Sequence, residues 1–203
     1  YGALYGDRRK TFFVREQSFC SDNGGSYLPN CFGMFNGDTG TGSSSGTATR
    51  DPQKDWWGIA YFNNNGYVDI YSKTANVRYN YKYFVLYTSS AWITDNRMNH
   101  VTMSIYGSND DVNWTNVADL VMGPNGVGTA TVPSGYVANP TWSSSNGYMA
   151  WFALSGQATT ASYYRFWRME FNTWDVVAGA PSFTTGGATI GGGIGSMYEM
   201  ELR

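Results

Sequence analysis

Oxygen-bearing side chains gather in the glycine-rich stretch Asn36–Ser43, where Asp38 and Thr41 are separated by only two residues. A tight turn of this composition exposes main-chain carbonyls beside those side chains. Hard oxygen ligands in such an arrangement suit Ca²⁺, which takes about 6–8 of them. The alternative is an ordinary turn in which Asp38 accepts hydrogen bonds from backbone N–H groups. Residue types alone leave both interpretations open.

Cys20 and Cys31 are the only two cysteines, and the residues around them are rich in Gly, Asn and Ser. We expect them to form a loop-closing disulfide, which would stabilise the chain by about 2–4 kcal/mol. The alternative is a pair of free thiols in a reducing compartment.

Two of the eight tryptophans, Trp142 and Trp174, lie among turn-forming residues. An aromatic ring in a polar loop can stack on the apolar face of a sugar or anchor a protein interface. The alternative is a ring that folds back onto the core. We take both residues as candidates for ligand binding.

Acid–base chemistry has little support in the sequence. Glutamate occurs only at positions 16, 170, 199 and 201, and the total of Asp and Glu is 15. A glycosidase needs two carboxylates flanking one bond. The pairs Glu170/Asp175 and Asp110/Asp111 are conceivable, but nothing singles either out, so we predict that the chain is not an enzyme.

The composition is aromatic and weakly charged. Aromatic residues make up 17% and charged residues 14%, against about 25% charged residues in an average soluble domain. A net charge of −2 gives no electrostatic footprint for nucleic acid. No stretch approaches the run of about 20 apolar residues that crosses a bilayer, so we expect no membrane insertion. The first residue is Tyr1 rather than Met, which we expect of a processed chain.

Short aromatic and β-branched runs separated by Gly, Asn and Ser predict many strands and scarcely any helix. Val101, Met103 and Ile105 alternate with polar residues, as in a strand with one buried face. The sequence Asn64-Asn65-Gly66 predicts a turn joining strands 57–61 and 67–71 into a hairpin. Further strands are expected at 12–14, 81–87, 129–132, 148–154, 163–171 and 197–202, with long loops at 21–46 and 178–196.

Several of these segments, taken in order, resemble the discoidin or coagulation-factor type C family, which includes many carbohydrate-binding modules. They are Asn36–Ser43, Trp56–Ile59, Ser104–Thr115, Tyr164–Phe171 and Tyr198–Leu202. The resemblance covers about residues 32–203 and departs from the family's loop pattern at Asn36 and Ser43. It implies an antiparallel β-sandwich, a galactose-binding-like jelly roll with long loops, preceded by an N-terminal arm over residues 1–31.

The resemblance also implies roles for single residues. A calcium ion would be held by Asp38, Thr41 and Glu199, with Asn36 and neighbouring carbonyls, and would join the first loop to the last strand as a structural cofactor. In related modules His, Arg and aromatic side chains on loops grip sugar hydroxyls, which makes His100 and Arg97 ligand-binding candidates. The tryptophans at positions 57, 114 and 167 match core or near-core positions, and Asn113-Trp114-Thr115 matches a structural turn rather than a glycosylation site.

These observations predict a non-catalytic module that binds a glycan or another surface ligand. The expected setting is extracellular or on a virion surface, in a secreted adhesin or a virion fibre or decoration protein. The alternative is a structural component that packs against neighbouring protein subunits and has no small ligand. Burial of Trp57, Trp114 and the alternating residues of strand 101–105 between two sheets is the central structural expectation.

Overall fold

The computed structural model of the chain describes residues 11–17, 35, 57–58, 66–88, 101–122, 131–138, 148–154, 163–174 and 196–203, and the structural statements below concern these. They contain nine β-strands and no α-helix. No helix within these ranges is long and apolar enough to cross a membrane.

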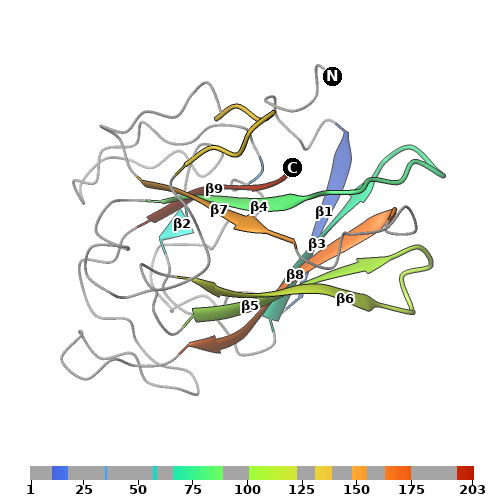
Figure 1. Cartoon of the computed structure of the whole chain (residues 1–203). Helices are drawn as coiled ribbons and strands as arrows, with labels where there is room; N and C mark the ends of the chain where they lie inside the picture. The colour runs from blue at the N-terminus through green and yellow to red at the C-terminus, as the bar shows by residue number, and fades with distance from the viewer. Residues whose placement is uncertain are drawn as a thin grey trace, which may run out of the picture.

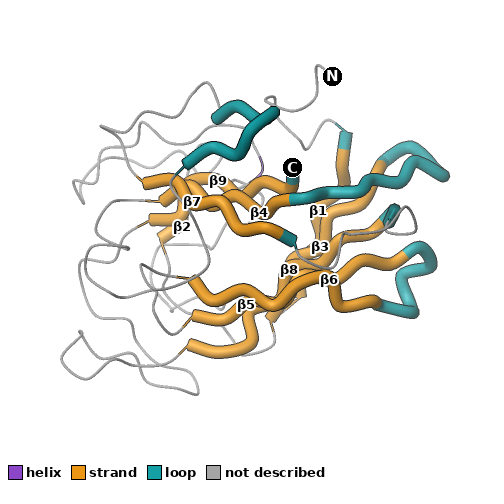
Figure 2. Tube along the Cα trace, in the orientation of Figure 1, coloured by secondary structure: helices purple, strands orange, loops and turns teal. Residues whose placement is uncertain are grey.

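The strands form two antiparallel sheets, which make the two layers of a sandwich (Figure 1). Figure 2 separates these strands from the loops that connect them. The five-stranded sheet has the order β1 (Phe12–Gln17), β3 (Gly66–Ser72), β8 (Phe166–Trp174), β5 (Val101–Ser108) and β6 (Thr115–Met122). The four-stranded sheet has the order β2 (Trp57–Gly58), β9 (Ser196–Leu202), β4 (Tyr83–Thr88) and β7 (Tyr148–Ala153). The all-β sandwich predicted from the sequence is confirmed.

The core lies between the two sheets, where alternate residues of each strand point inward. In β5, Met103 and Ile105 are fully buried, as their alternation with polar residues predicts. Residues of the other sheet, including Phe84, Phe152 and Met200, belong to the same buried cluster. This burial of apolar area is the main force that holds the layers together.

The tryptophan predictions have mixed outcomes. Trp167 is buried in the core, as expected. Trp114 is not between the sheets: it is half-buried, with its ring 4.0 Å from the Arg168 guanidinium carbon. Arg168 alternates with Trp167 along β8 and therefore points to the outer face, which is where Trp114 lies. The side chain of Trp57 lies outside the described residues.

The predicted hairpin of strands 57–61 and 67–71 is wrong. Trp57 and Gly58 pair with β9 in the four-stranded sheet, whereas β3 pairs with β1 and β8 in the other sheet. The chain crosses from one layer to the other between these strands. A turn sequence between two alternating strands favours a hairpin, but it does not determine whether the second strand returns to the same sheet.

The strand predicted at 129–132 is also wrong for its two described residues, Thr131 and Val132. Thr131 and Val132 belong to an irregular segment, 131–138, whose residues Val132, Tyr136 and Ala138 pack against buried residues of β4 and β7. Pro133 follows directly and has no N–H for a ladder hydrogen bond, which opposes a strand at this point.

The remaining strand predictions are confirmed, with boundaries shifted by up to three residues. The first of them, β1, is an edge strand of the five-stranded sheet and pairs with β3 over six residues. The boundary of an N-terminal arm at residue 31 stays a prediction.

Candidate functional site

Most of the predicted site residues lie outside the described residues, namely Cys20, Cys31, Asn36, Asp38, Thr41, Arg97, His100 and Trp142. Trp174 is the last residue of β8, and Glu199 lies in β9 opposite Tyr87 of β4. For these two only the backbone is described. No group of three or more His, Cys, Asp or Glu side chains within the described ranges could hold a metal ion.

The strand register nevertheless shows which described strand ends adjoin the predicted ligand-binding segments in the sequence. Val101, which directly follows His100, pairs with Met122 on one side and with Trp174 on the other. The connection that contains Arg97 and His100 starts after Thr88 and ends at Val101, beside Trp174. The connection that contains Trp142 ends at Tyr148, which pairs with Thr88 in the other sheet. Figure 1 shows the starts of β5 and β9 and the end of β8 on the same side of the molecule. We call this end of the sandwich, marked by the pairs Val101–Trp174 and Thr88–Tyr148, the loop end.

Phe35, the residue before the predicted metal ligand Asn36, is 1% exposed and belongs to the core cluster. Its burial joins the chain to the body of the sandwich at the residue before the glycine-rich sequence. The carboxylate and hydroxyl oxygens of the predicted ligand set are of the kind that Ca²⁺ prefers. The residue types thus fit a calcium site, and its assembly stays a prediction.

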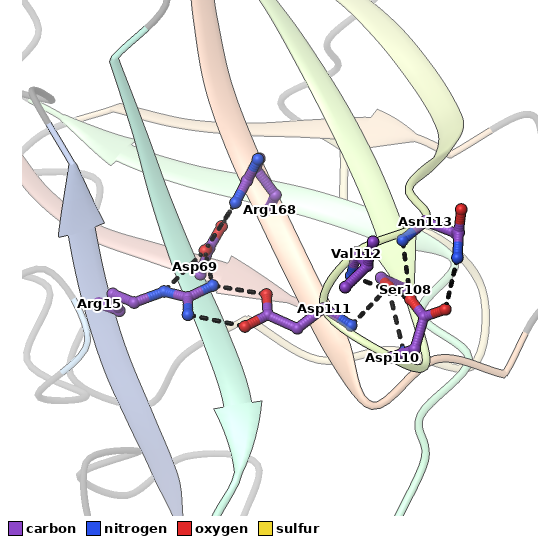
Figure 3. A network of polar contacts seen from close by, with 8 residues as sticks. All are labelled: Arg15, Asp69, Ser108, Asp110, Asp111, Val112, Asn113 and Arg168. Carbon is purple, nitrogen blue, oxygen red and sulfur yellow. Dashed lines mark hydrogen bonds and ion pairs between the residues drawn. The ribbon is translucent and has the colours of Figure 1, made fainter.

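The outer face of the five-stranded sheet carries a charged network that the sequence did not predict (Figure 3). Asp69 of β3 is fully buried although it points away from the core. Arg168 of β8 donates to it from Nε at 2.7 Å and from Nη2 at 3.0 Å. Arg15 of β1 donates to the same carboxylate from Nη2 at 2.6 Å and from Nε at 3.1 Å. Two guanidinium groups thus compensate one buried charge.

Arg15 extends the network to the turn between β5 and β6. Its two terminal nitrogens donate to Asp111 at 2.6 and 2.8 Å. The hydrogen bond from Arg15 is the largest cause that lowers the pKa of Asp111 below its ordinary value. Asp111 has a positive φ of 64°, a conformation that Asp adopts more easily than most residues. The edge strand β1 is thereby fastened to a turn 96 residues away in sequence.

Arg168 is enclosed by two aromatic rings. Its guanidinium carbon is 3.5 Å from the ring centroid of Tyr67 and 4.0 Å from that of Trp114. Planar guanidinium groups stack on aromatic faces in this way, and the attraction grows as water is excluded. Trp114 therefore covers the ion pair with Asp69 instead of filling the core. A rule that places aromatic residues in the core could not reveal this position.

The turn Ser108–Asn113 is fixed by its own side chains. Asp110 accepts from the backbone of Val112 and Asn113 and from the Asn113 side chain at 2.6 Å. The hydrogen bond from the Asn113 side chain is the largest cause of a pKa of Asp110 far below the ordinary range. The side chain of Asn113 is therefore part of the turn, in keeping with the structural role expected of Asn113-Trp114-Thr115. Neither Asp110 nor Asp111 is placed as a catalytic acid.

The outer face of the four-stranded sheet carries an aromatic cluster. Tyr83, Tyr136 and Trp151 meet edge to face, with ring centroids 4.9–5.7 Å apart. Burial is the largest cause that raises the pKa of Tyr136. The buried pair Glu201–Arg203 lies at the end of β9, where Tyr87 also donates to Glu201. Segment 131–138 covers this face through Tyr136, so the cluster is an extension of the core.

Comparison with solved structures places this architecture among known ones. The family 32 carbohydrate-binding module of EndoD from Streptococcus pneumoniae matches with a TM-score of 0.51 over 98% of this chain and 97% of its own. The two chains share a fold. At 16% identity the likeness concerns the fold alone. A glycoside hydrolase structure matches 79% of this chain and 24% of its own with a TM-score of 0.32, which is too low to support an argument.

No protein-family model matches the sequence, and a search of curated proteins gives no match.

Proposed function

We propose that this chain is a non-catalytic carbohydrate-binding module whose glycan site lies at the loop end. The observation that carries the proposal is the fold shared with the EndoD module along almost the whole of both chains. Composition supports it, because aromatic residues and few charges suit stacking on sugars and hydrogen bonding to hydroxyls. We place the protein in an extracellular or virion-surface setting, where such a module would attach its carrier to a glycan-bearing surface.

The proposed ligand-binding residues are Trp142, Trp174, His100 and Arg97. The proposal is supported by the pairing of Trp174 with Val101, the residue that follows His100 in the sequence. In such a site the indole ring of a tryptophan would stack on the apolar face of the sugar, and the imidazole of a histidine would form hydrogen bonds with the sugar hydroxyls.

A glycan array followed by calorimetry with the best ligand tests the proposal. Trp174→Ala and Trp142→Ala should each weaken binding about tenfold, the size of a typical aromatic hot spot. Val112→Ser is the matched control, because Val112 is 76% exposed in the β5–β6 turn, at the opposite end of β5 from Val101. If the chain is an oligomer in size-exclusion chromatography and binds no glycan on the array, the result would contradict the proposal and favour the structural assembly role.

We also propose a structural Ca²⁺ bound by Asp38, Thr41, Glu199 and Asn36. Such an ion would join the loop that follows Phe35 to strand β9, so its removal should lower the melting temperature. Calorimetric melting with EDTA and with added Ca²⁺ measures this, and Asp38→Ala should abolish the difference. Identical melting curves would argue against a bound ion.

The predicted disulfide between Cys20 and Cys31 is tested separately. Thiol alkylation and mass spectrometry before and after reduction distinguish a bridge from two free thiols. Two alkylated cysteines without reduction would rule the bridge out.

A further inference from the structure

A row of aromatic rings crosses the outer face of the five-stranded sheet at the end away from Trp174. Phe13, Tyr71 and Phe166 lie opposite one another in the registers of β1, β3 and β8. Neighbouring ring centroids are 5.2 Å apart in both pairs, with tilts of 35–36°. We call these three side chains the aromatic row. Phe166 and Trp174 are the two ends of β8, so about 25 Å of strand separates the row from the loop end.

Each ring of the aromatic row has a cation next to it. The Nζ of Lys73 is 5.3 Å from the Phe13 centroid, and the guanidinium carbons of Arg15 and Arg165 are 5.7 and 4.9 Å from Tyr71 and Phe166. Arg15 is already bound to Asp69 and Asp111. Arg165 differs, because within the described part of the chain its buried Nε has no hydrogen-bond partner and no carboxylate pairs with its guanidinium.

The row is open to solvent at its edge. Phe13 is 48% exposed, and Tyr163, two residues before Arg165, is 50% exposed. Phe13 and Tyr163 are the exposed aromatic side chains among the described residues. Single exposed apolar residues are normal at protein surfaces. Here, however, the exposed ring of Phe13 is one end of a row of three aromatic rings that is lined by cations.

We propose that the aromatic row is a second binding surface and that it takes an acidic polysaccharide. The apolar faces of sugar rings would stack on Phe13 and Tyr71, while a carboxylate of the same polysaccharide would bind Arg165. The carboxylates of Asp69 and Asp111 do not oppose this, because they pair with Arg15 and Arg168. The surface lies on a sheet face and does not depend on the glycan site proposed at the loop end.

Binding of alginate, a polyuronate, tests the inference, with neutral dextran as the uncharged comparison. The wild-type chain should bind alginate, more weakly as salt rises, and should bind dextran at least tenfold more weakly. Phe13→Leu keeps an apolar side chain against Tyr71 but removes the ring, and Arg165→Gln removes the cation beside Phe166. Each should weaken alginate binding about tenfold. Thermal unfolding verifies that both variants fold.

Two matched controls lie outside the row. Val121→Ala changes an exposed apolar residue on β6, and Arg78→Gln removes an exposed cation of the β3–β4 connection. Both should bind alginate within twofold of the wild type. Absence of alginate binding, or unchanged binding by both folded row variants, would overturn the inference and leave the loop-end proposal standing. Equal binding of dextran would overturn the role of charge.

Discussion

Arg168 of β8 donates two hydrogen bonds, at 2.7 and 3.0 Å, to the carboxylate of Asp69 on the neighbouring strand β3. Asp69 is fully buried. The pair lies on the outer face of the sheet, where the residues of a β-sandwich are usually polar and exposed to solvent. Its cover consists of Arg15 from the edge strand and the ring of Trp114 from a turn. Together, the ion pairs of Asp69 and Asp111 with Arg15 and Arg168 connect β1, β3, β8 and the β5–β6 turn.

Replacing Asp69 by Asn should lower the free energy of unfolding by about 3 kcal/mol, because it leaves two guanidinium groups facing a neutral amide. Chemical denaturation measures the loss. Asp119→Asn is the control, since Asp119 is exposed and is bound by Ser104 and Asn116. Its loss should stay below about 1 kcal/mol. Equal losses for the two variants would contradict a special role of Asp69.

Replacing Trp114 by Ala should cost about 1–2 kcal/mol, the size of a cation–π contact with some lost burial. A tryptophan in the core between the sheets would cost about 3–5 kcal/mol instead. Trp114→Phe should retain most of the stability, because a ring remains above Arg168. Urea denaturation of the two variants decides between these positions, and a core-sized loss would refute the outer-face location.

Gly107 of β5 is a position where any side chain should be costly. A Cβ there would overlap the ring of Tyr164, which is itself held against Trp167 with centroids 5.4 Å apart. Gly107→Ala should therefore destabilise by at least about 1–3 kcal/mol. Adding Tyr164→Leu should recover part of the loss, because a smaller side chain makes room. If the double variant is no more stable than Gly107→Ala, steric overlap is not the cause.

Glu170 should destabilise the fold at neutral pH. Burial is the largest cause that raises its pKa, ahead of the opposing attraction of Arg168. A raised pKa in the folded state means that this group favours folding while protonated, below its ordinary pKa of 4.5. That contribution is lost as the pH rises through the folded-state pKa. Glu170→Gln should thus raise the melting temperature at pH 7 and leave it unchanged at pH 3. A lower melting temperature at pH 7 would show that attraction to Arg168 dominates.

The sequence by itself determined the fold class and most of the strands. Alternation over Val101–Tyr106 indicated one buried face, and Met103 and Ile105 are buried, because a two-residue period is a local property of a strand. The sequence was less accurate at Trp174, which it placed among turn-forming residues, whereas Trp174 is the last residue of strand β8.

Only the tertiary structure decided which strands are neighbours and which face each side chain uses. The sequence Asn64-Asn65-Gly66 has a hairpin composition, yet the strands on either side of it join different sheets, because each pairs with strands that are distant in the sequence. The network of Asp69, Arg15 and Arg168 was hidden for the same reason. Its members lie 54 and 99 residues apart, and only the register of three strands brings them within hydrogen-bond distance.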